Sequence, residues 1–171
     1  MPRFPLLFVF ACLSTIAWSQ SAPVQLCVAN MQVSKSGTDD PAGRTLLLKF
    51  LAKEKNKSVA TDIPVDASQP DQAMQQAKAK NRDYLVTTNQ TESYTENSQM
   101  PMMGTMSQTA MPTFYVTTRY QLAKVSDGSE VMSGSEKASD RGSEQNAIGF
   151  TMHKIADKVT EAIKKAAPAA K

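Results

Sequence analysis

Residues 113–124 read Thr-Phe-Tyr-Val-Thr-Thr-Arg-Tyr-Gln-Leu-Ala-Lys, and this stretch decides the fold. Every second side chain of this stretch is suited to burial in a core, whereas Arg119, Gln121 and Lys124 make the opposite side of the strand polar. The alternation predicts a strand with one buried face. A helix from a cap at Ser143 to about Ala166 repeats apolar residues at helical spacing, and we expect it to lie across this strand. The positions expected to share the interior are Phe114, Val116, Thr118, Tyr120 and Leu122 of the strand, and Ile148, Met152, Ile155, Ala156, Val159 and Ile163 of the helix.

The first half of the chain predicts alternating strands and helices. Residues 23–33 are apolar on both faces, which is typical of an interior strand. A loop over residues 34–40 then ends in a helix start, with Asp40 as the cap and Pro41 in the first turn, and lysines between 53 and 57 close this helix. Residues 58–65 predict a short edge strand. Ser68 opens, through a pattern like a capping box, a small-residue helix that reaches Asn81.

The second half predicts an antiparallel group of strands before the final helix. Residues 82–93 form the expected partner of 113–124, and Ser126-Asp127-Gly128 predicts a tight turn into a strand over 129–137. The order is therefore β-α-β-α-β-β-β-α. This order predicts an α+β fold, a mixed α/β sandwich in which a mixed sheet of about five strands carries three helices on one or both sides.

The first 19 residues predict a cleavable signal peptide for export. Arg3 supplies the positive start, an apolar run without a charge follows, and Ala17 and Ser19 are the small residues before the cut. The run is too short for a membrane-spanning helix. We expect a single domain over residues 20–166, a disordered tail over 167–171, and a periplasmic or secreted location. The alternative is a lipid anchor on Cys12, because residues 9–12 loosely match a lipobox.

The net charge and the cysteine content limit the classes of binding partner and covalent bond that the sequence predicts. The net charge is +3, and loss of Arg3 with the leader lowers it to +2, which does not indicate binding to nucleic acid or to an anionic membrane surface. Only Cys27 remains after processing, so no internal disulfide is expected. Its place in an apolar strand predicts a buried thiol.

The sequence does not indicate an enzyme. His153 and Cys27 are the only histidine and cysteine after the leader, and a nucleophilic Cys–His pair is the single catalytic arrangement that they allow. Phosphate-binding glycine loops and the common hydrolase and zinc motifs are missing from the sequence. Asp39 and Asp40 are expected to serve a helix start rather than a metal ion.

An uncharged segment holds five methionines within residues 100–111, and it is the candidate site. Methionine makes adaptable contacts, so the segment is expected to contact an envelope protein partner of unknown identity, or simply to connect two strands. The alternative from another class is a Cu(I) site, because thioethers are soft ligands, and copper is then the cofactor. Both readings use the same residues: Met100, Met102, Met103, Met106 and Met111.

Three stretches resemble a known envelope domain. They are the opening strand at residues 24–30, the Asp-Tyr-Leu-Val strand at 83–86, and the hairpin from Tyr120 to Gly128 with Gly134 beyond it. In this order they resemble the domain shared by the TolB amino-terminal region, the curli-secretion protein CsgG and the lipoprotein activators of penicillin-binding proteins. The resemblance implies an envelope protein that binds other proteins without catalysis. The membrane-crossing hairpins of the pore-forming member have no counterpart in this sequence, so pore formation is not implied.

Overall fold

A computed structural model of the chain describes residues 24–53, 59–61, 64–97 and 112–166. The leader, the methionine-rich segment and the C-terminal tail lie outside these ranges, so the predictions made for them stay predictions. The described strands are β1 (Val24–Val28), β2 (Met31–Val33), β3 (Thr38–Asp40), β4 (Val59–Thr61), β5 (Tyr84–Asn97), β6 (Pro112–Lys124) and β7 (Glu130–Asp140), and the helices are α1 (Pro41–Leu51), α2 (Pro70–Ala79) and α3 (Glu144–Ala166).

The strands form one mixed sheet, which confirms the predicted class and element order. β5 is central: it pairs in parallel with β1 and β2 along one edge and antiparallel with β6 along the other. β7 follows β6 antiparallel, and β4 extends the opposite side in parallel with β1. The sheet has seven strands rather than about five. The difference arises because two short strands, β2 and β3, form where one continuous strand and a loop were expected.

The interruption between β1 and β2 is held by residues far away in the sequence. Ala29 forms an isolated parallel bridge with Val65. The side-chain amide of Asn30 donates to the Asp66 carbonyl oxygen at 3.0 Å, and its backbone N–H donates to the Ala67 carbonyl at 3.2 Å. β1 and β2 are therefore two segments of one interrupted strand along β5, and β3 folds back antiparallel on β2.

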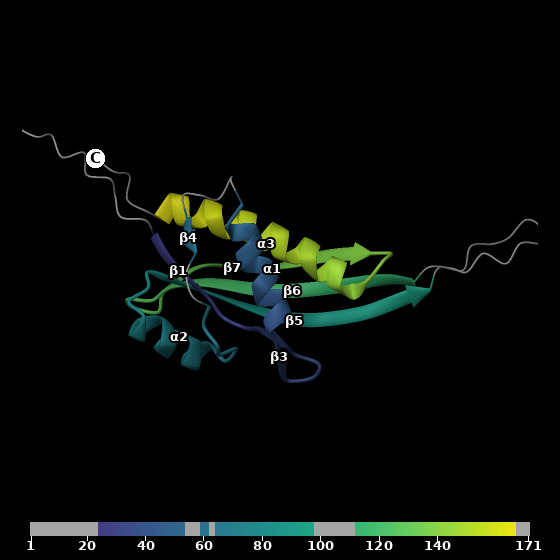
Figure 1. Cartoon of the computed structure of the whole chain (residues 1–171), viewed down its shortest axis with the longest axis horizontal. Helices are drawn as coiled ribbons and strands as arrows, with labels where there is room; N and C mark the ends of the chain where they lie inside the picture. Colours follow the sequence, from purple (N-terminus) through teal and green to yellow (C-terminus); the bar gives the residue numbers. More distant parts are fainter. Residues whose placement is uncertain (1–23, 54–58, 62–63, 98–111, 167–171) are drawn as a thin grey trace, which may run out of the picture.

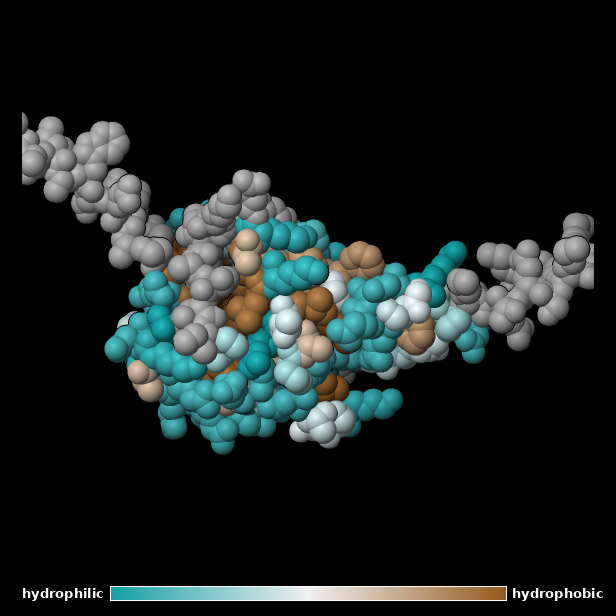
Figure 2. Space-filling view, in the orientation of Figure 1, coloured by the Kyte–Doolittle hydropathy of each residue, from teal (hydrophilic) through white to brown (hydrophobic). Residues whose placement is uncertain are grey.

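Helices cover both faces of the sheet unequally. In Figure 1, α1 and α3 lie on one face while α2 lies on the other, near the start of β5. The larger core lies under α1 and α3, where Val116, Tyr120 and Leu122 pack with the buried side of α3, including Ile155 and Val159. The expected contact between strand 113–124 and the final helix is thus confirmed. In Figure 2 hydrophobic residues gather around α1, whereas the surface over α2 is hydrophilic.

The smaller core lies under α2 and uses small side chains. Ala73 and Ala77 of α2 pack with Cys27, Leu85 and Val125, and the short alanines let the helix approach the sheet closely. Cys27 is fully buried in this cluster, as predicted.

Helix boundaries depart from the predictions where local signals were weak. Asp40 does cap α1, and its carboxylate accepts from the Ala42 N–H at 2.8 Å, but the helix ends at Leu51, before the lysines expected to close it. α2 begins at Pro70 with Gln69 at the cap position and no side-chain capping bond, so the capping box expected at Ser68 does not form. α2 also ends at Ala79, because Asn81 adopts a positive φ of 52° that ends the helical path.

Candidate functional site

The candidate site sits on the longest strands of the sheet. β5 and β6 pair along their whole length, from Tyr84 opposite Lys124 to Asn97 opposite Pro112, and the pairing contains one bulge. The last six residues of β5 and the first six of β6 are here called the outer ribbon (residues 92–97 and 112–117). β7 pairs with β6 as far as Phe114, and the tip of the ribbon projects beyond α3 (Figure 1). At about 3.3 Å per residue the outer ribbon is roughly 20 Å long.

The predicted methionine site is attached to this ribbon but lies outside the described residues. Met100, Met102, Met103, Met106 and Met111 belong to residues 98–111, which connect β5 to β6. What the structure adds is the position of the two flanks: Asn97 and Pro112 are paired neighbours. The segment therefore begins and ends at the tip of the outer ribbon, and its metal or partner contacts remain predictions.

A bulge in β5 decides which side chains the ribbon exposes. The register shifts between Gln90 and Glu92, so Thr91 is an extra residue opposite β6. Such an insertion reverses the alternation of the strand. Gln90 and Ser93 consequently face α3, and Tyr94 is turned to the opposite side, where it pairs with Tyr115.

The side of the sheet that α1 and α3 leave uncovered carries polar rows. Each row runs directly across β5, β6 and β7, because the register places the three residues opposite one another. We call this surface the open face. Its rows are Tyr94, Tyr115 and Ser139; Glu92, Thr117 and Lys137; Asn89, Arg119 and Ser135; and Thr87, Gln121 and Ser133.

Two stacked tyrosines end the open face at the outer ribbon. The rings of Tyr94 and Tyr115 lie 5.0 Å apart between centroids, with planes inclined by 12°. Tyr94 is 51% exposed. The negative charge of Glu96 raises the pKa of the Tyr115 phenol above its ordinary value. The pair therefore offers an aromatic surface with Tyr94 exposed and Tyr115 half-buried.

Polar contacts hold the rest of the open face in place. Glu92 accepts from the Thr117 hydroxyl at 2.9 Å, and Gln121 donates to the Glu130 carboxylate at 2.9 Å. Asn89 accepts from the Ser34 hydroxyl at 2.7 Å. Arg119, by contrast, is exposed at the centre of its row, where its guanidinium can donate several hydrogen bonds to a ligand.

A cleft of about 1180 Å³ borders the outer ribbon on the side of the turn between β2 and β3. Glu144, in the first turn of α3, accepts there from the side chains of Gln90 at 2.9 Å and Ser93 at 2.5 Å. These bonds attach the helix start to the bulged strand. The cleft walls are mostly hydroxyl, amide and carboxylate groups, with Tyr94 at the rim.

The structure separates the two residues that a catalytic pair would need. Cys27 lies in the core under α2. His153 is on α3, across the sheet, where its ring stacks on Phe50 at 4.9 Å and its Nε2 lies 3.9 Å from the Asp157 carboxylate. The Cys27–His153 pair that the sequence left open therefore does not form. Within the described ranges, no three or more His, Cys, Asp or Glu side chains are placed to hold a metal ion.

Sequence reasoning missed the residues that now define the candidate site. Tyr115 and Arg119 were strand residues without an assigned functional role, and Tyr94 lay one residue beyond the strand predicted over 82–93. Nothing in their spacing reveals which part of the sheet no helix covers. The signal that could have found Tyr94 and Tyr115 is their position just outside the methionine segment, on or next to strands expected to pair. No comparable feature of the sequence indicates the bulge at Thr91.

Comparisons with known proteins reveal the fold. No family model matches the sequence, and no curated protein matches it. A variant of the PelC dodecamer from Paraburkholderia phytofirmans is similar with a TM-score of 0.54 at 15% identity, over 80% of this chain and 88% of that one. Another structure of that dodecamer has a TM-score of 0.51 at 13% identity, over 78% and 87%.

A hypothetical protein from Chlamydia trachomatis has the same fold, with a TM-score of 0.52 at 8% identity, over 86% of this chain and 99% of that one. At these identities the likeness demonstrates a shared fold and nothing further. None of the three bears the TolB or CsgG name, so the resemblance to that domain stays a prediction. Within the described part of the chain, no helix is long and apolar enough to cross a membrane.

Proposed function

We propose that this chain is an exported, non-enzymatic protein that binds another protein of the cell envelope through the open face and the outer ribbon. The observation that carries the proposal is the stack of half-buried Tyr115 on exposed Tyr94, at the end of a sheet face that α2 covers only in part. Tyrosines with an apolar ring and a polar tip are enriched at protein interfaces and frequently dominate their energy.

The polar rows next to the tyrosines suit a protein partner. Arg119 is exposed, and it lies between amide and hydroxyl side chains on the neighbouring strands. Aromatic side chains and arginine are the residues enriched at interfaces, and polar groups around them supply hydrogen bonds. The strands beneath fix the backbone positions of these side chains, so no loop has to be ordered on binding.

Export and assembly are supported by independent observations. The first 19 residues have the three parts of a signal peptide. The similar PelC structures are described as dodecamers, so this fold occurs in a protein that makes extensive protein contacts. The separation of Cys27 from His153 by the sheet supports a role without nucleophilic catalysis.

Site-specific photocrosslinking tests the proposal. A photoreactive residue at Tyr94 is expected to capture a single envelope protein in near-stoichiometric yield, and a photoreactive residue at Phe150 is the control. Phe150 is 50% exposed on α3, and Tyr94 is 51% exposed, so the two sites are matched in accessibility. The double variant Tyr94→Ala with Tyr115→Ala should weaken capture at Arg119 at least about tenfold. Equal capture from Tyr94 and Phe150 would contradict the proposal.

Copper handling is the second candidate, because the five methionines belong to one segment whose two flanks, Asn97 and Pro112, are paired neighbours. Three or four thioethers from one segment can hold Cu(I). Titration with Cu(I) of the exported chain, and of a variant in which all five methionines are replaced by leucine, separates the candidates. Equal affinity in both proteins excludes the copper role. Bound copper without a crosslinked protein would instead favour it.

A further inference from the structure

Charged residues are segregated along the length of the molecule. At the end where β1 begins and α3 finishes, here called the basic end, cations outnumber carboxylates. The cations are Lys78, Lys80, Arg82, Lys124, Lys164 and Lys165, against Asp83, Asp127, Glu130 and Glu161. Toward the outer ribbon the balance reverses, with Asp39, Glu92, Glu96, Asp140 and Glu144 against Lys35, Lys137 and Arg141.

Contacts confirm that the members of the basic end lie together. A cleft of about 590 Å³ is lined by Lys78, Arg82 and Lys124, from α2, the start of β5 and the end of β6. Figure 1 places the last turn of α3 at the same end of the molecule, and Tyr84, which lines the cleft, belongs to the same core cluster as Ile163 and Ala166. Figure 1 also places the first described residue of β1 and the last of α3 at this end.

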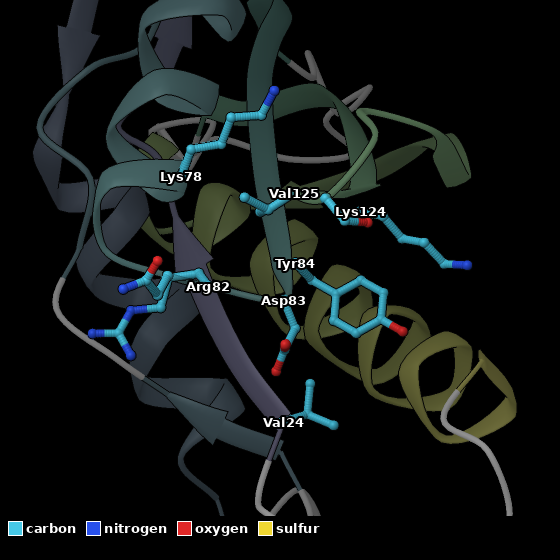
Figure 3. A pocket seen from close by; sticks show the side chains of 9 residues that line it. Val24, Lys78, Arg82, Asp83, Tyr84, Lys124 and Val125 are labelled. Carbon is cyan, nitrogen blue, oxygen red and sulfur yellow. The ribbon is translucent and has the colours of Figure 1, made fainter.

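The cleft is not built for a single small anion. In Figure 3 the side chains of Lys78, Arg82 and Lys124 point in different directions, and Asp83 lies between them. The Asp83 carboxylate accepts from the Gln25 N–H at 2.7 Å, and Arg82 donates to the Gln25 side-chain oxygen at 2.8 Å. These three cations point apart, and the carboxylate between them is already hydrogen-bonded. They are therefore better placed to contact many anions spread over a surface than to enclose one anion in a pocket.

We infer that the basic end binds the anionic headgroup surface of a lipid membrane and thereby turns the outer ribbon away from it. The net charge of +2 expected after processing does not by itself indicate membrane binding, because carboxylates at the opposite end offset the cations of the basic end. Each Lys or Arg near an anionic bilayer contributes about 1 kcal/mol, which is about fivefold in affinity, and the carboxylates reduce the sum. The acidic outer ribbon is repelled by the same surface, so binding is oriented.

This inference does not depend on the proposed protein partner. A membrane contact at the basic end and a protein contact at the open face use separate residues, so either can fail alone. Together they would place the Tyr94–Tyr115 stack facing away from the bilayer.

Vesicle binding with two charge-matched variants tests the inference. The exported chain is mixed with vesicles of phosphatidylcholine alone or of equal parts phosphatidylcholine and phosphatidylglycerol. The first variant carries Lys78→Glu, Lys124→Glu, Lys164→Glu and Lys165→Glu; the control carries Lys35→Glu, Arg119→Glu, Lys137→Glu and Arg141→Glu. All eight side chains are exposed, and each variant changes the net charge equally. Circular dichroism and thermal unfolding verify that both variants fold.

The unmodified chain should bind only the vesicles with phosphatidylglycerol, and its binding should decline with rising salt. The basic-end variant should lose affinity at least about tenfold, whereas the control should lose far less. Equal losses in both variants, equal binding to neutral vesicles, or binding to heparin without binding to vesicles would overturn the inference.

Discussion

On the helix side of β6, Val116, Tyr120 and Leu122 are at most 4% exposed, whereas on the other side Arg119 is exposed and Gln121 is half-buried. One strand thus supplies the core with alternate side chains, and on its other side it offers Arg119 to solvent while Thr117 and Ala123 are buried. The contrast indicates that stability and binding are assigned to opposite faces of the same backbone. Substitutions chosen by face should therefore separate the two properties.

The largest effect is expected from the buried face. Leu122→Ala removes a fully buried side chain from the main core, and it should lower the free energy of unfolding by about 2–5 kcal/mol through lost burial and the cavity left behind. Urea unfolding followed by circular dichroism measures this loss. Gln121→Ala, one residue away, is the control and should change stability by less than about 0.5 kcal/mol. Similar losses in both variants would refute the division of faces.

A second prediction uses the contact between β6 and β7 on the buried side. A Cβ on Gly134 would lie 2.7 Å from the hydroxyl oxygen of Tyr120 and 2.9 Å from its Cζ. Gly134→Val should therefore force the Tyr120 ring aside and lower the free energy of unfolding by roughly 1–3 kcal/mol. Thermal unfolding compares it with Ser135→Val, the same new side chain on the adjacent exposed residue. Equal stability of the two variants would mean that Tyr120 does not cover Gly134.

The third prediction concerns the acid dependence of the junction between β7 and α3. The backbone N–H groups of Ser143 and Gly142, at 2.9 and 2.6 Å, lower the pKa of the Asp140 carboxyl. Because the folded pKa lies below the unfolded one, this carboxylate stabilises the fold above the ordinary value of 3.8, and the contribution is lost as pH falls through the lowered pKa.

Asp140→Asn should therefore be less stable than the unmodified chain at neutral pH, by less than Leu122→Ala is. The difference should shrink below pH 3.8. Urea unfolding across this pH range measures both curves, and Asp127→Asn serves as a comparison in an exposed turn. A difference that stays constant through the acid range would show that Asp140 acts without its charge.

The smallest effect on stability is expected on the open face. Arg119→Ala removes an exposed side chain, and it should change the free energy of unfolding by less than about 0.5 kcal/mol. The same variant should weaken capture of the envelope partner by a photoreactive residue at Tyr94. A stable protein with unaltered capture would remove Arg119 from the proposed interface, and a strongly destabilised one would contradict the contrast between the faces.

The elements that the sequence predicted well are those whose signals are local and repeated. The helical spacing from Ile148 to Ile163 and the alternation around Leu122 each extend over several turns or residues, so burial on one side dominates their structure. The Asp40 cap was also predictable, because its hydrogen bond spans two residues. These signals depend on neighbours in the chain alone.

The features that could not be predicted depend on distant partners. The break at Asn30 requires the Asp66 carbonyl, 36 residues later. The placement of Tyr94 requires the bulge at Thr91, since strict alternation from Tyr84 would have put Tyr94 under α3. The uncovered state of the open face depends on where all three helices pack. The candidate site was therefore hidden even though the strands that carry it were expected.

The parallel pairing of β1 with β5 carries a consequence for the order of folding. β5, β6, β7 and α3 follow one another in the chain and contact their sequence neighbours, whereas Leu26 of β1 must wait for Tyr84 to be synthesised. Contacts between distant residues form slowly, because a long loop must close first. We expect pulsed hydrogen exchange to protect β6 amides before those of β1. Until then β1 remains unpaired with β5 in the emerging polypeptide.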